Sequence, residues 1–258
     1  MLANYHAHTT RCGHATGTER EYIEKAIEGG YKAFGFSDHT PYPFTNGYTS
    51  HIRMKMQELE DYCSTILQLK EEYSSDITIH LGLEVEYYPA HFERLKKAAS
   101  DMGVEYFLLG QHFTNNEYDG FYAGRPCGRD ILEKYSAQCI EGMETGSYLY
   151  FAHPDLIHFT EDEEVYKEYM RPVCKAAKRL NIPLEINILG LWSGRNYPNP
   201  LFWELAAEEG NDAVLGLDCH DPGKILVPDA VSEAGQMARR LGINVIEDLE
   251  ARLRISSI

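Results

Sequence analysis

Short apolar runs alternate along the chain with longer segments in which apolar residues recur every three or four positions. The runs predict β-strands and the longer segments predict amphipathic helices. The predicted strands are residues 2–6, 33–37, 77–86, 106–111, 148–152, 183–187 and 214–218. The predicted helices are residues 19–28, 53–72, 92–100, 129–145, 163–180, 200–209 and 232–241. This regular alternation of strand and helix predicts a parallel sheet with helical crossovers.

The turn after the first predicted strand favours one form of parallel sheet over another. A dinucleotide-binding fold carries a glycine-rich turn there, whereas this chain has Tyr5-His6-Ala7-His8. A closed barrel is therefore favoured over an open, doubly wound sheet. The 258 residues contain no visible repeat or low-complexity segment, and we expect one domain spanning residues 1–258.

Composition and charge narrow the range of partners. A formal net charge of −16 argues against long nucleic acid, because backbone binding needs clustered Lys and Arg. No apolar run reaches the roughly 18 residues that span a bilayer, and the N-terminus lacks the features of a secretory signal. Six scattered cysteines without a C-x-x-C pair are typical of reduced thiols. We therefore expect a cytoplasmic protein without a membrane partner, whose oligomeric state the sequence does not indicate.

Histidines and carboxylates gather where the predicted strands end. The residues concerned, in chain order, are His6, His8, His14, His39, Glu84, His112, His153, Asp218 and His220. In parallel α/β folds the C-terminal strand ends form one rim, where catalytic groups collect. These nine residues should therefore converge in space.

The types and spacing of these residues indicate a metal centre. Imidazole and carboxylate suit Zn, Mn and Fe. His6 and His8 are two residues apart, as are Asp218 and His220, and such pairs point to the same side of an extended strand. A single histidine at a strand end is more often just a solvated polar residue, but seven of the 11 histidines fall at this rim. Nine ligands exceed the needs of one ion, which implies two or three ions and a bridging carboxylate such as Glu84.

The motifs around these residues resemble those of a known family and follow its order from one end of the chain to the other. They are Tyr5-His6-Ala7-His8-Thr9, Cys12-Gly13-His14, Phe36-Ser37-Asp38-His39, Gly82-Leu83-Glu84-Val85, Gly110-Gln111-His112, Ala152-His153-Pro154 and Asp218-Cys219-His220. As a set they resemble the PHP (polymerase and histidinol phosphatase) family. The resemblance implies a distorted (β/α)7 barrel, similar to a TIM barrel, with three divalent ions at the C-terminal ends of the strands.

Carried over by motif, the resemblance assigns ligands to each ion. The first ion would take His6, His8, Glu84 and Asp218, the second Glu84, His112 and His153, and the third His14, His39 and His220. Leu184-Glu185-Ile186-Asn187, Arg195 and Tyr197-Pro198 resemble the L-histidinol-phosphate phosphatase branch, in which the corresponding arginine contacts phosphate. Two segments depart from the family pattern: Leu217-Asp218-Cys219-His220 has Cys where Ala is common, and residues 188–194 differ from the commoner Asn-Thr-x-Gly-Leu-Arg.

The expected activity is hydrolysis of L-histidinol phosphate, in histidine biosynthesis, by a metal-dependent phosphomonoesterase. A hydroxide that bridges two ions would attack phosphorus in line, and Arg195 would bind a non-bridging oxygen. Asp38 is either the proton donor to the leaving oxygen or only an acceptor that orients a metal-bound histidine. The sequence leaves these two roles open.

Substrate recognition rests on fewer signals. The ammonium and imidazole of histidinol phosphate need acceptors, for which the candidates are Glu86, Glu117, Asp119 and Asp155. Glu86 shares the strand parity of Glu84 and is the best placed of them. Tyr42, in a Pro- and aromatic-rich loop, is a candidate for a lid over the organic group, and Trp192 for a pocket wall beside Arg195. The remaining histidines, His51, His80, His91 and His158, are interpreted as surface or structural residues.

Three other functions fit part of the pattern. The same barrel would suit a phosphatase of nucleotides, sugars or phosphotyrosine, or a nuclease, although the negative charge argues against a nuclease. A non-catalytic metal-binding domain has no physical need of so complete a ligand set. A metal-assisted amidohydrolase would need a lysine at a strand end, and no predicted strand end carries one.

Overall fold

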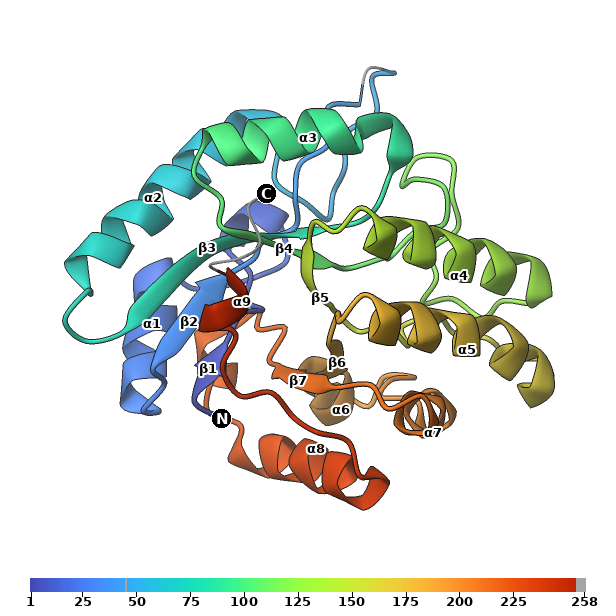
Figure 1. Ribbon diagram of the computed structural model, residues 1–258. Coiled ribbons are helices and arrows are strands. Elements are labelled where there is room, and N and C mark those ends of the chain that lie inside the picture. The colour runs from blue at the N-terminus through green and yellow to red at the C-terminus, as the bar shows by residue number, and fades with distance from the viewer. Residues whose placement is uncertain (45, 254–258) are drawn as a thin grey trace.

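The computed structural model describes residues 1–44 and 46–253. Within that part of the chain, seven parallel strands lie side by side in chain order (Figure 1). They are β1 (Ala3–Asn4), β2 (Ala33–Phe36), β3 (Thr78–Val85), β4 (Tyr106–Leu109), β5 (Tyr148–Phe151), β6 (Leu184–Asn187) and β7 (Ala213–Gly216). The longer helices are α1 (Glu19–Glu28), α2 (Leu59–Glu72), α3 (Pro89–Asp101), α4 (Arg129–Glu144), α5 (Glu163–Arg179), α7 (Pro200–Glu208) and α8 (Pro228–Leu241). Each strand is thus followed by a helix, as the sequence predicts.

The sheet curls until its two edges meet. Beyond the ends of β1 and β7, Ala7 and Cys219 form a parallel bridge, and the His8 amide donates to the Cys219 carbonyl at 2.9 Å. The side chain of Asn4 accepts a hydrogen bond from the Leu217 amide at 2.9 Å. The expected seven-stranded barrel is confirmed, with a short seam that joins the first and last strands just below the predicted metal site.

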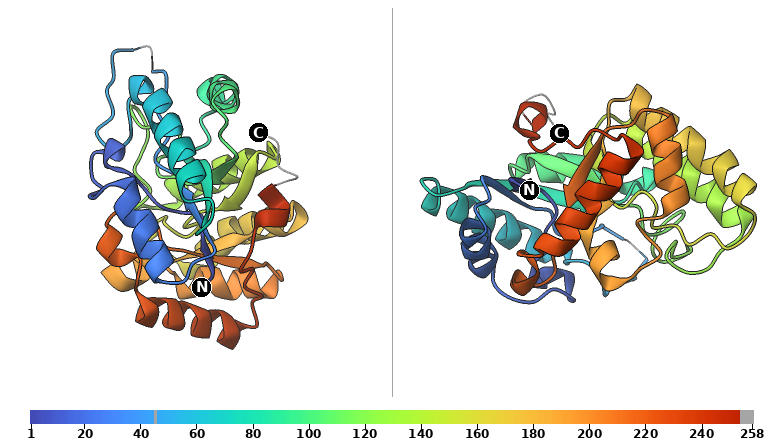
Figure 2. Two further views of the ribbon diagram at one scale, coloured as in Figure 1. Left: turned by 90° about the vertical axis from the view of Figure 1, so that its left-hand side faces the viewer. Right: turned by 90° about the horizontal axis from the view of Figure 1, so that it is seen from below.

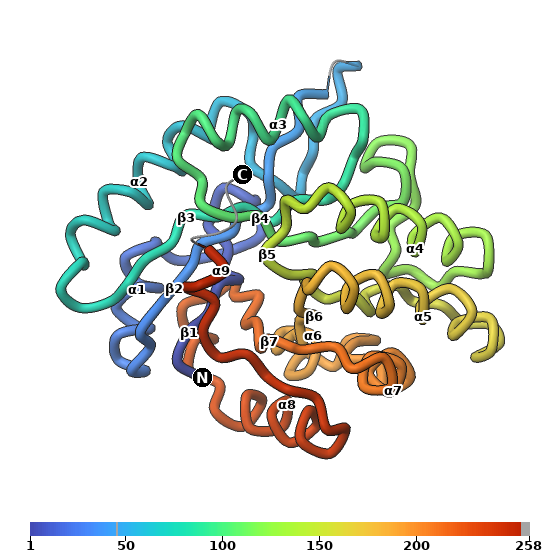
Figure 3. The backbone as a smooth tube through the Cα atoms, in the orientation of Figure 1, coloured from blue at the N-terminus to red at the C-terminus, as the bar shows by residue number. Residues whose placement is uncertain are grey.

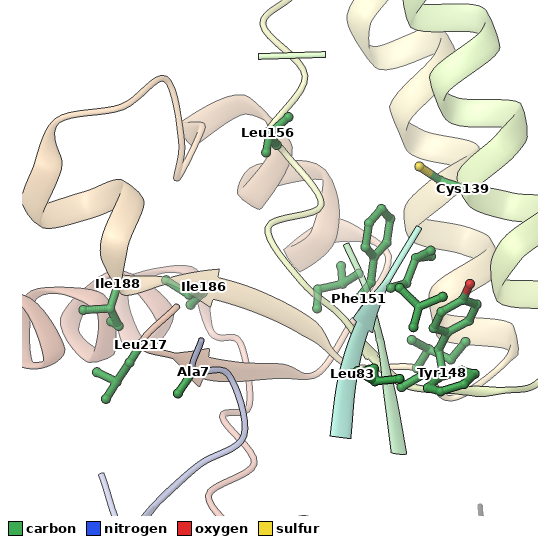
Figure 4. Packing of buried hydrophobic residues seen from close by; sticks show 14 of the residues in the cluster. Ala7, Leu83, Cys139, Tyr148, Phe151, Leu156, Ile186, Ile188 and Leu217 are labelled. Carbon is green, nitrogen blue, oxygen red and sulfur yellow. The ribbon is translucent and has the colours of Figure 1, made fainter. Parts of the chain in front are cut away.

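Helices cover the outside of the barrel, as the tube trace shows (Figure 3). The strands are buried on both faces, as expected for a parallel sheet covered by helices. Figure 4 shows Leu83, Tyr148 and Phe151 gathered near Cys139 of α4, while Ala7, Ile186 and Leu217 lie together around the seam. This apolar layer fixes the strands, and with them the side chains at their ends.

The N-terminal end of the barrel is filled by a second apolar cluster. Tyr5, Tyr106, Tyr150 and Leu249 are buried there with smaller side chains from other strands. His80 lies between Glu105 and Glu250, with its ring nitrogens 2.9 and 2.5 Å from their carboxylates, and so ties α9 (Glu250–Leu253) to this end. The left view of Figure 2 shows α9 and the long loop after β2 at opposite ends of the molecule. His80 is therefore structural, as predicted, and the other end of the barrel is left for a site.

The predicted helix at residues 53–72 was wrong at its start. The structure has a 3-10 turn at Met56–Glu58 and then α2 from Leu59, so Arg53 lies in the preceding loop. The reason is electrostatic: the buried Arg53 side chain pairs with Glu86 and Glu117, which an exposed helical position would not permit. The short helix α6 (Ile188–Ser193) and α9 were not predicted, and α3 and α8 begin earlier than predicted, each at a proline.

Two further expectations concern the environment of the chain. All six cysteines are buried free thiols, in line with the reading of their spacing. Among residues 1–44 and 46–253, no helix has the length and apolar character that crossing a bilayer requires.

Candidate metal centre and substrate cavity

The nine predicted metal ligands converge at the C-terminal end of the barrel. Glu84 lies within β3, and the other eight follow β1, β2, β4, β5 and β7. His6, His8, His39, Glu84, His153 and Asp218 are buried, His112 and His220 are partly buried, and His14 is exposed. The site is thus closed on the barrel side and open to solvent near His14.

The Glu84 carboxylate stands at the centre of the histidines. Its Oε1 atom is 2.7 Å from His153 Nε2 and 3.7 Å from the Nε2 atoms of His6 and His112. Its Oε2 atom is 2.8 Å from His39 Nδ1 and 3.6 Å from His8 Nε2. One carboxylate therefore faces five imidazoles that come from four different strands, which is the arrangement expected of a bridging ligand.

Asp218 forms a second focus beside the first. Its Oδ1 atom lies 3.1 Å from His8 Nε2, 3.5 Å from His6 Nε2 and 3.4 Å from His220 Nδ1. The Nε2 atoms of His220 and His14 are 3.1 Å apart, and the His14 ring lies 5.3 Å from the His39 ring. The rings of His220 and His14 both place Nδ1 against a backbone carbonyl, so both Nε2 atoms present lone pairs, which suits a shared cation.

Acceptors behind the histidines fix the orientation of their rings. The Nδ1 atoms lie next to oxygen in His6 (Glu185, 2.7 Å), His8 (Asp38, 3.3 Å), His112 (Glu86, 3.2 Å), His14 (the Cys12 carbonyl, 3.0 Å) and His220 (the Asp218 carbonyl, 3.0 Å). A carboxylate or carbonyl only accepts, so Nδ1 carries the proton and the Nε2 lone pair faces the site. In the described part of the chain, Nε2 of His6 and of His8 is buried without a hydrogen-bond partner. These donors fit divalent ions, which would fill that need.

Burial also sets the charge of the ligands. It lowers the pKa of His220 to about 3, and the pKa of His39 falls well below its usual range, also chiefly through burial. These imidazoles are therefore neutral, as a metal ligand must be. Burial raises the pKa of Glu84, but the facing imidazoles of His39, His112 and His6 outweigh it and hold that pKa well below its usual range. Burial also lowers the pKa values of His6, His8 and His112, but the surrounding carboxylates outweigh it and raise them, to about 9 for His8. A divalent ion would therefore displace protons from these three imidazoles.

Two of the ligands have a strained backbone. His153 and Asp218 have φ angles of 32° and 48°, in a region that side chains other than glycine rarely adopt. Both are held from β6: the Glu185 carboxylate accepts from the His153 amide at 2.9 Å, and Asn187 Nδ2 donates to Asp218 Oδ2 at 3.1 Å. Sequence reasoning gave Glu185 and Asn187 no role, although two polar residues of equal parity in a buried strand were a signal.

Gly110 leaves the space that Glu84 occupies. A Cβ atom at this position would overlap the Glu84 carboxylate. We expect Gly110→Ala to displace that carboxylate and to lower bound metal and kcat about tenfold or more, since outer contacts of metal sites have effects of this size. Metal analysis by mass spectrometry and a phosphatase assay test this.

The control for Gly110→Ala is Gly235→Ala in α8. There the nearest atom to an added Cβ is Arg239 Nη1 at 3.5 Å, so nothing near the site moves. Equal metal content in the two variants and in the unmodified protein would contradict the role given to Gly110.

A cavity of about 550 Å³ opens onto the metal centre. Its lining includes five of the predicted ligands, namely His14, His39, His112, Asp218 and His220. The remaining lining residues are His51, Ile52, Phe113, Tyr122, Arg125, Leu189, Arg195 and Tyr197. Arg195 Nη1 donates to Tyr197 Oη at 2.7 Å. Burial lowers the pKa of Arg195, but the nearby Tyr197 and Asp218 outweigh it and keep the guanidinium charged. The predicted phosphate-binding arginine thus shares one cavity with the metal ligands.

Some of the lining was not predicted. His51, interpreted as a surface or structural residue, is exposed and also lies in the cavity wall. Tyr122 and Arg125 carried no motif signal, because they lie in a loop after β4 that only the fold brings opposite Arg195.

The predicted substrate-binding residues other than Arg195 lie outside this lining. Tyr42 is buried and donates a hydrogen bond to the Glu86 carbonyl. Glu86 and Glu117 both pair with Arg53, at 2.7 and 2.6 Å. Asp119 lines a separate cavity, and Asp155 is buried and accepts from Trp203 Nε1 at 3.0 Å. Trp192 is exposed, with Lys224 Nζ 4.6 Å above its ring.

Asp38 is enclosed behind the histidines. It accepts hydrogen bonds from the His39 amide at 2.8 Å and from the Thr9 hydroxyl, and its Oδ1 lies 3.3 Å from His8 Nδ1. Its side chain is fully buried and is not part of the cavity lining.

Comparisons with known proteins agree with this architecture. The PHP domain model matches residues 4–188. The "probable histidinol-phosphatase" of Deinococcus radiodurans is 30% identical over 253 residues, covering 93% of this chain and 95% of that protein, and that of Schizosaccharomyces pombe is 26% identical, covering 87% and 82%. The histidinol phosphate phosphatase of Lactococcus lactis, solved with zinc, L-histidinol and phosphate, shares the fold with a TM-score of 0.74 at 16% identity, over 95% of each chain. The chain therefore belongs to the PHP domain family, in the branch of the histidinol-phosphatases.

Proposed function

We propose that this protein is a metal-dependent phosphomonoesterase that hydrolyses L-histidinol phosphate to L-histidinol and phosphate. The observation that carries the proposal is the cavity itself, whose lining contains Arg195 together with five of the predicted metal ligands. The relatives with the names given above support the choice of substrate, and a volume of about 550 Å³ suits a small ester.

Divalent ions would bind among the nine predicted ligands. We assign them three sites, with Glu84 shared between the first two, and Zn, Mn or Fe as the ions that this donor set suits. When bound, such ions supply a nucleophile at neutral pH and neutralise charge on the phosphoryl oxygens. Counting metal per chain by mass spectrometry after reconstitution tests the number and identity of the ions. A cytoplasmic location is part of the same proposal, and the six free cysteines support it.

Arg195 binds and orients the phosphoryl group in this proposal. Its guanidinium is a planar donor that matches two oxygens of a phosphate at once. The hydrogen bond from Nη1 to Tyr197 holds one edge of the guanidinium and leaves its other N–H donors for the substrate. The organic half of the substrate would extend toward the wall that contains His51, Ile52 and Phe113.

We assign Asp38 the orienting role of the two that the sequence leaves open. Its enclosed position lets it hold the His8 ring, whereas a proton donor needs access to the leaving oxygen. Asp38→Asn is therefore expected to weaken metal binding about 10- to 100-fold and to leave kcat at saturating metal within a few-fold of the unmodified protein. Metal titrations followed by activity measure both quantities.

The opposite result would make Asp38 the proton donor. If Asp38→Asn binds metal normally, loses turnover and no longer shows a fall in kcat toward alkaline pH, the carboxyl group donates the proton.

A phosphate-release assay tests the function as a whole. Metal-reconstituted protein is compared on L-histidinol phosphate, a nucleoside monophosphate, phosphotyrosine and an aryl phosphate. We expect kcat/KM to be highest on histidinol phosphate and to vanish with chelator. Equal kcat/KM on all four substrates would support a phosphomonoesterase but contradict the proposed substrate. No activity on any of them, with metal bound, would indicate a non-catalytic metal-binding domain.

A further inference from the structure

We propose that Arg53 is a positioning residue that joins the wall of the substrate cavity to a metal-site histidine. The inference rests on the proposed metal centre and cavity, but not on the identity of the substrate. Arg53 lies in the loop between β2 and α2, outside the cavity lining, and no sequence motif marks it.

The Arg53 guanidinium is buried among acceptors from three other segments. Its Nε donates to Glu117 Oε2 at 2.6 Å, and its Nη1 donates to the Thr40 carbonyl at 3.2 Å. Its Nη2 forms an ion pair with Glu86 Oε2 at 2.7 Å. The side chain of Arg53 is 1% exposed and those of Glu86 and Glu117 are 2% and 4% exposed. Charges buried this deeply are retained at a cost in solvation, which argues for a specific role of these three residues.

Glu86 connects Arg53 to the metal centre. The other oxygen of its carboxylate, Oε1, lies 3.2 Å from His112 Nδ1. A carboxylate at this place holds the Nδ1–H tautomer and directs His112 Nε2 to Glu84 and the cavity. Arg53 holds Glu86 in turn, so it acts on His112 without touching it.

Glu117 connects Arg53 to the cavity wall. Its Oε1 accepts from Tyr48 Oη at 2.8 Å and from Ser50 Oγ at 2.7 Å. The next two residues, His51 and Ile52, line the cavity, and the Ile52 amide donates to Ser50 Oγ at 3.2 Å. The carboxylate of Glu117 therefore fixes the segment of residues 48–52 on one side and Arg53 on the other.

The two carboxylates of this network outnumber its one guanidinium, so other hydrogen-bond donors are needed to satisfy them. One guanidinium faces two carboxylates, and His112 Nδ1–H and the two hydroxyls supply the remaining donors. Lysine cannot replace the fork of Arg53, because a single ammonium lacks donors fixed in two directions. The two arms are separable, since each glutamate contacts a different part of the site.

The test uses Glu117→Gln, Glu86→Gln and Arg53→Lys in the full chain, with Arg171→Lys as the matched control. Arg171 also pairs with two glutamates, Glu208 and Glu209, but on the outside of α5 and α7. Three quantities are measured: zinc affinity by competition with a chelating dye, hydrogen–deuterium exchange in residues 48–52, and KM and kcat at saturating metal.

Each variant has its own expected profile. Glu117→Gln should speed exchange in residues 48–52 and raise KM about tenfold, with zinc affinity unchanged. Glu86→Gln should weaken zinc binding about 10- to 100-fold and leave the exchange unchanged. Arg53→Lys should show both effects and Arg171→Lys neither.

Other outcomes would overturn the proposal. Identical profiles for Glu117→Gln and Glu86→Gln, or loss of thermal stability alone, would reduce the network to a structural support. If Arg53→Lys does not fold, the profiles of Glu117→Gln and Glu86→Gln still show whether the two glutamates act on different parts of the site. If the protein has no activity on histidinol phosphate, the proposed substrate is wrong. Zinc affinity and hydrogen–deuterium exchange would still test the role proposed for Arg53.

Discussion

Glu84→Gln is expected to lose most of its bound metal and to lower kcat about 10³-fold, the largest effect of any single change in the site. Glutamine has the same shape as glutamate but no charge, and an amide nitrogen with two N–H donors replaces one of the two carboxylate oxygens. In the place of Oε1 those donors would face His6 Nε2 and in the place of Oε2 they would face His8 Nε2. In either place they would hydrogen-bond to a lone pair that the ion needs. The same substitution removes the negative charge that balances the ions. Metal content by mass spectrometry and kcat at saturating metal measure the two effects.

Glu105→Gln serves as the control for Glu84→Gln. Glu105 also pairs with a buried histidine, His80, but at the opposite end of the barrel. It should keep full metal content and activity even if its stability falls. Chelation of the unmodified protein should reproduce the loss of activity, and added metal should restore it there but not in Glu84→Gln. Full metal content and normal kcat in Glu84→Gln would show that Glu84 is not a ligand.

The ligand cluster was predictable because it depends on rules that act along short stretches. Strand ends can be located from apolar runs. The parity argument for His6 and His8 and for Asp218 and His220 did not hold as stated, because β1 ends at Asn4, β7 ends at Gly216 and Asp218 has a left-handed φ of 48°. Parallel strands then bring their C-terminal ends together whatever the loops do. The structure places all nine predicted ligands at one rim for this reason.

The surrounding residues were not predictable in the same way. Arg53 contacts Glu86 and Glu117 across 33 and 64 residues, and nothing in the local pattern distinguishes it from the exposed residue of a helix. Glu86 has the parity that suggested a place inside the barrel, but Arg53 and His112 occupy its carboxylate. Such partners depend on loop conformation, which is set by many long-range contacts. They decide which groups face substrate, so the cavity wall was the least predictable part of the site.

Arg195→Ala is expected to lower kcat/KM about 10²- to 10³-fold, because it removes a charged donor from the cavity that five of the predicted metal ligands also line. Arg195→Lys keeps the charge but loses the planar fork, and we expect it to recover only part of the activity. Since inorganic phosphate carries the same oxygens, its inhibition constant should rise in parallel with the loss for the ester. Steady-state kinetics with and without phosphate measure both.

Arg179→Ala is the matched control for Arg195→Ala, since Arg179 pairs with Glu144 on the outer surface of the barrel. It should behave like the unmodified protein in every kinetic constant. Metal content should stay the same in all of these arginine variants, which separates phosphate binding from metal binding. If Arg195→Ala keeps kcat/KM within two- or threefold, Arg195 does not bind the phosphoryl group. Arg125, the other arginine that lines this cavity, then becomes the residue to test.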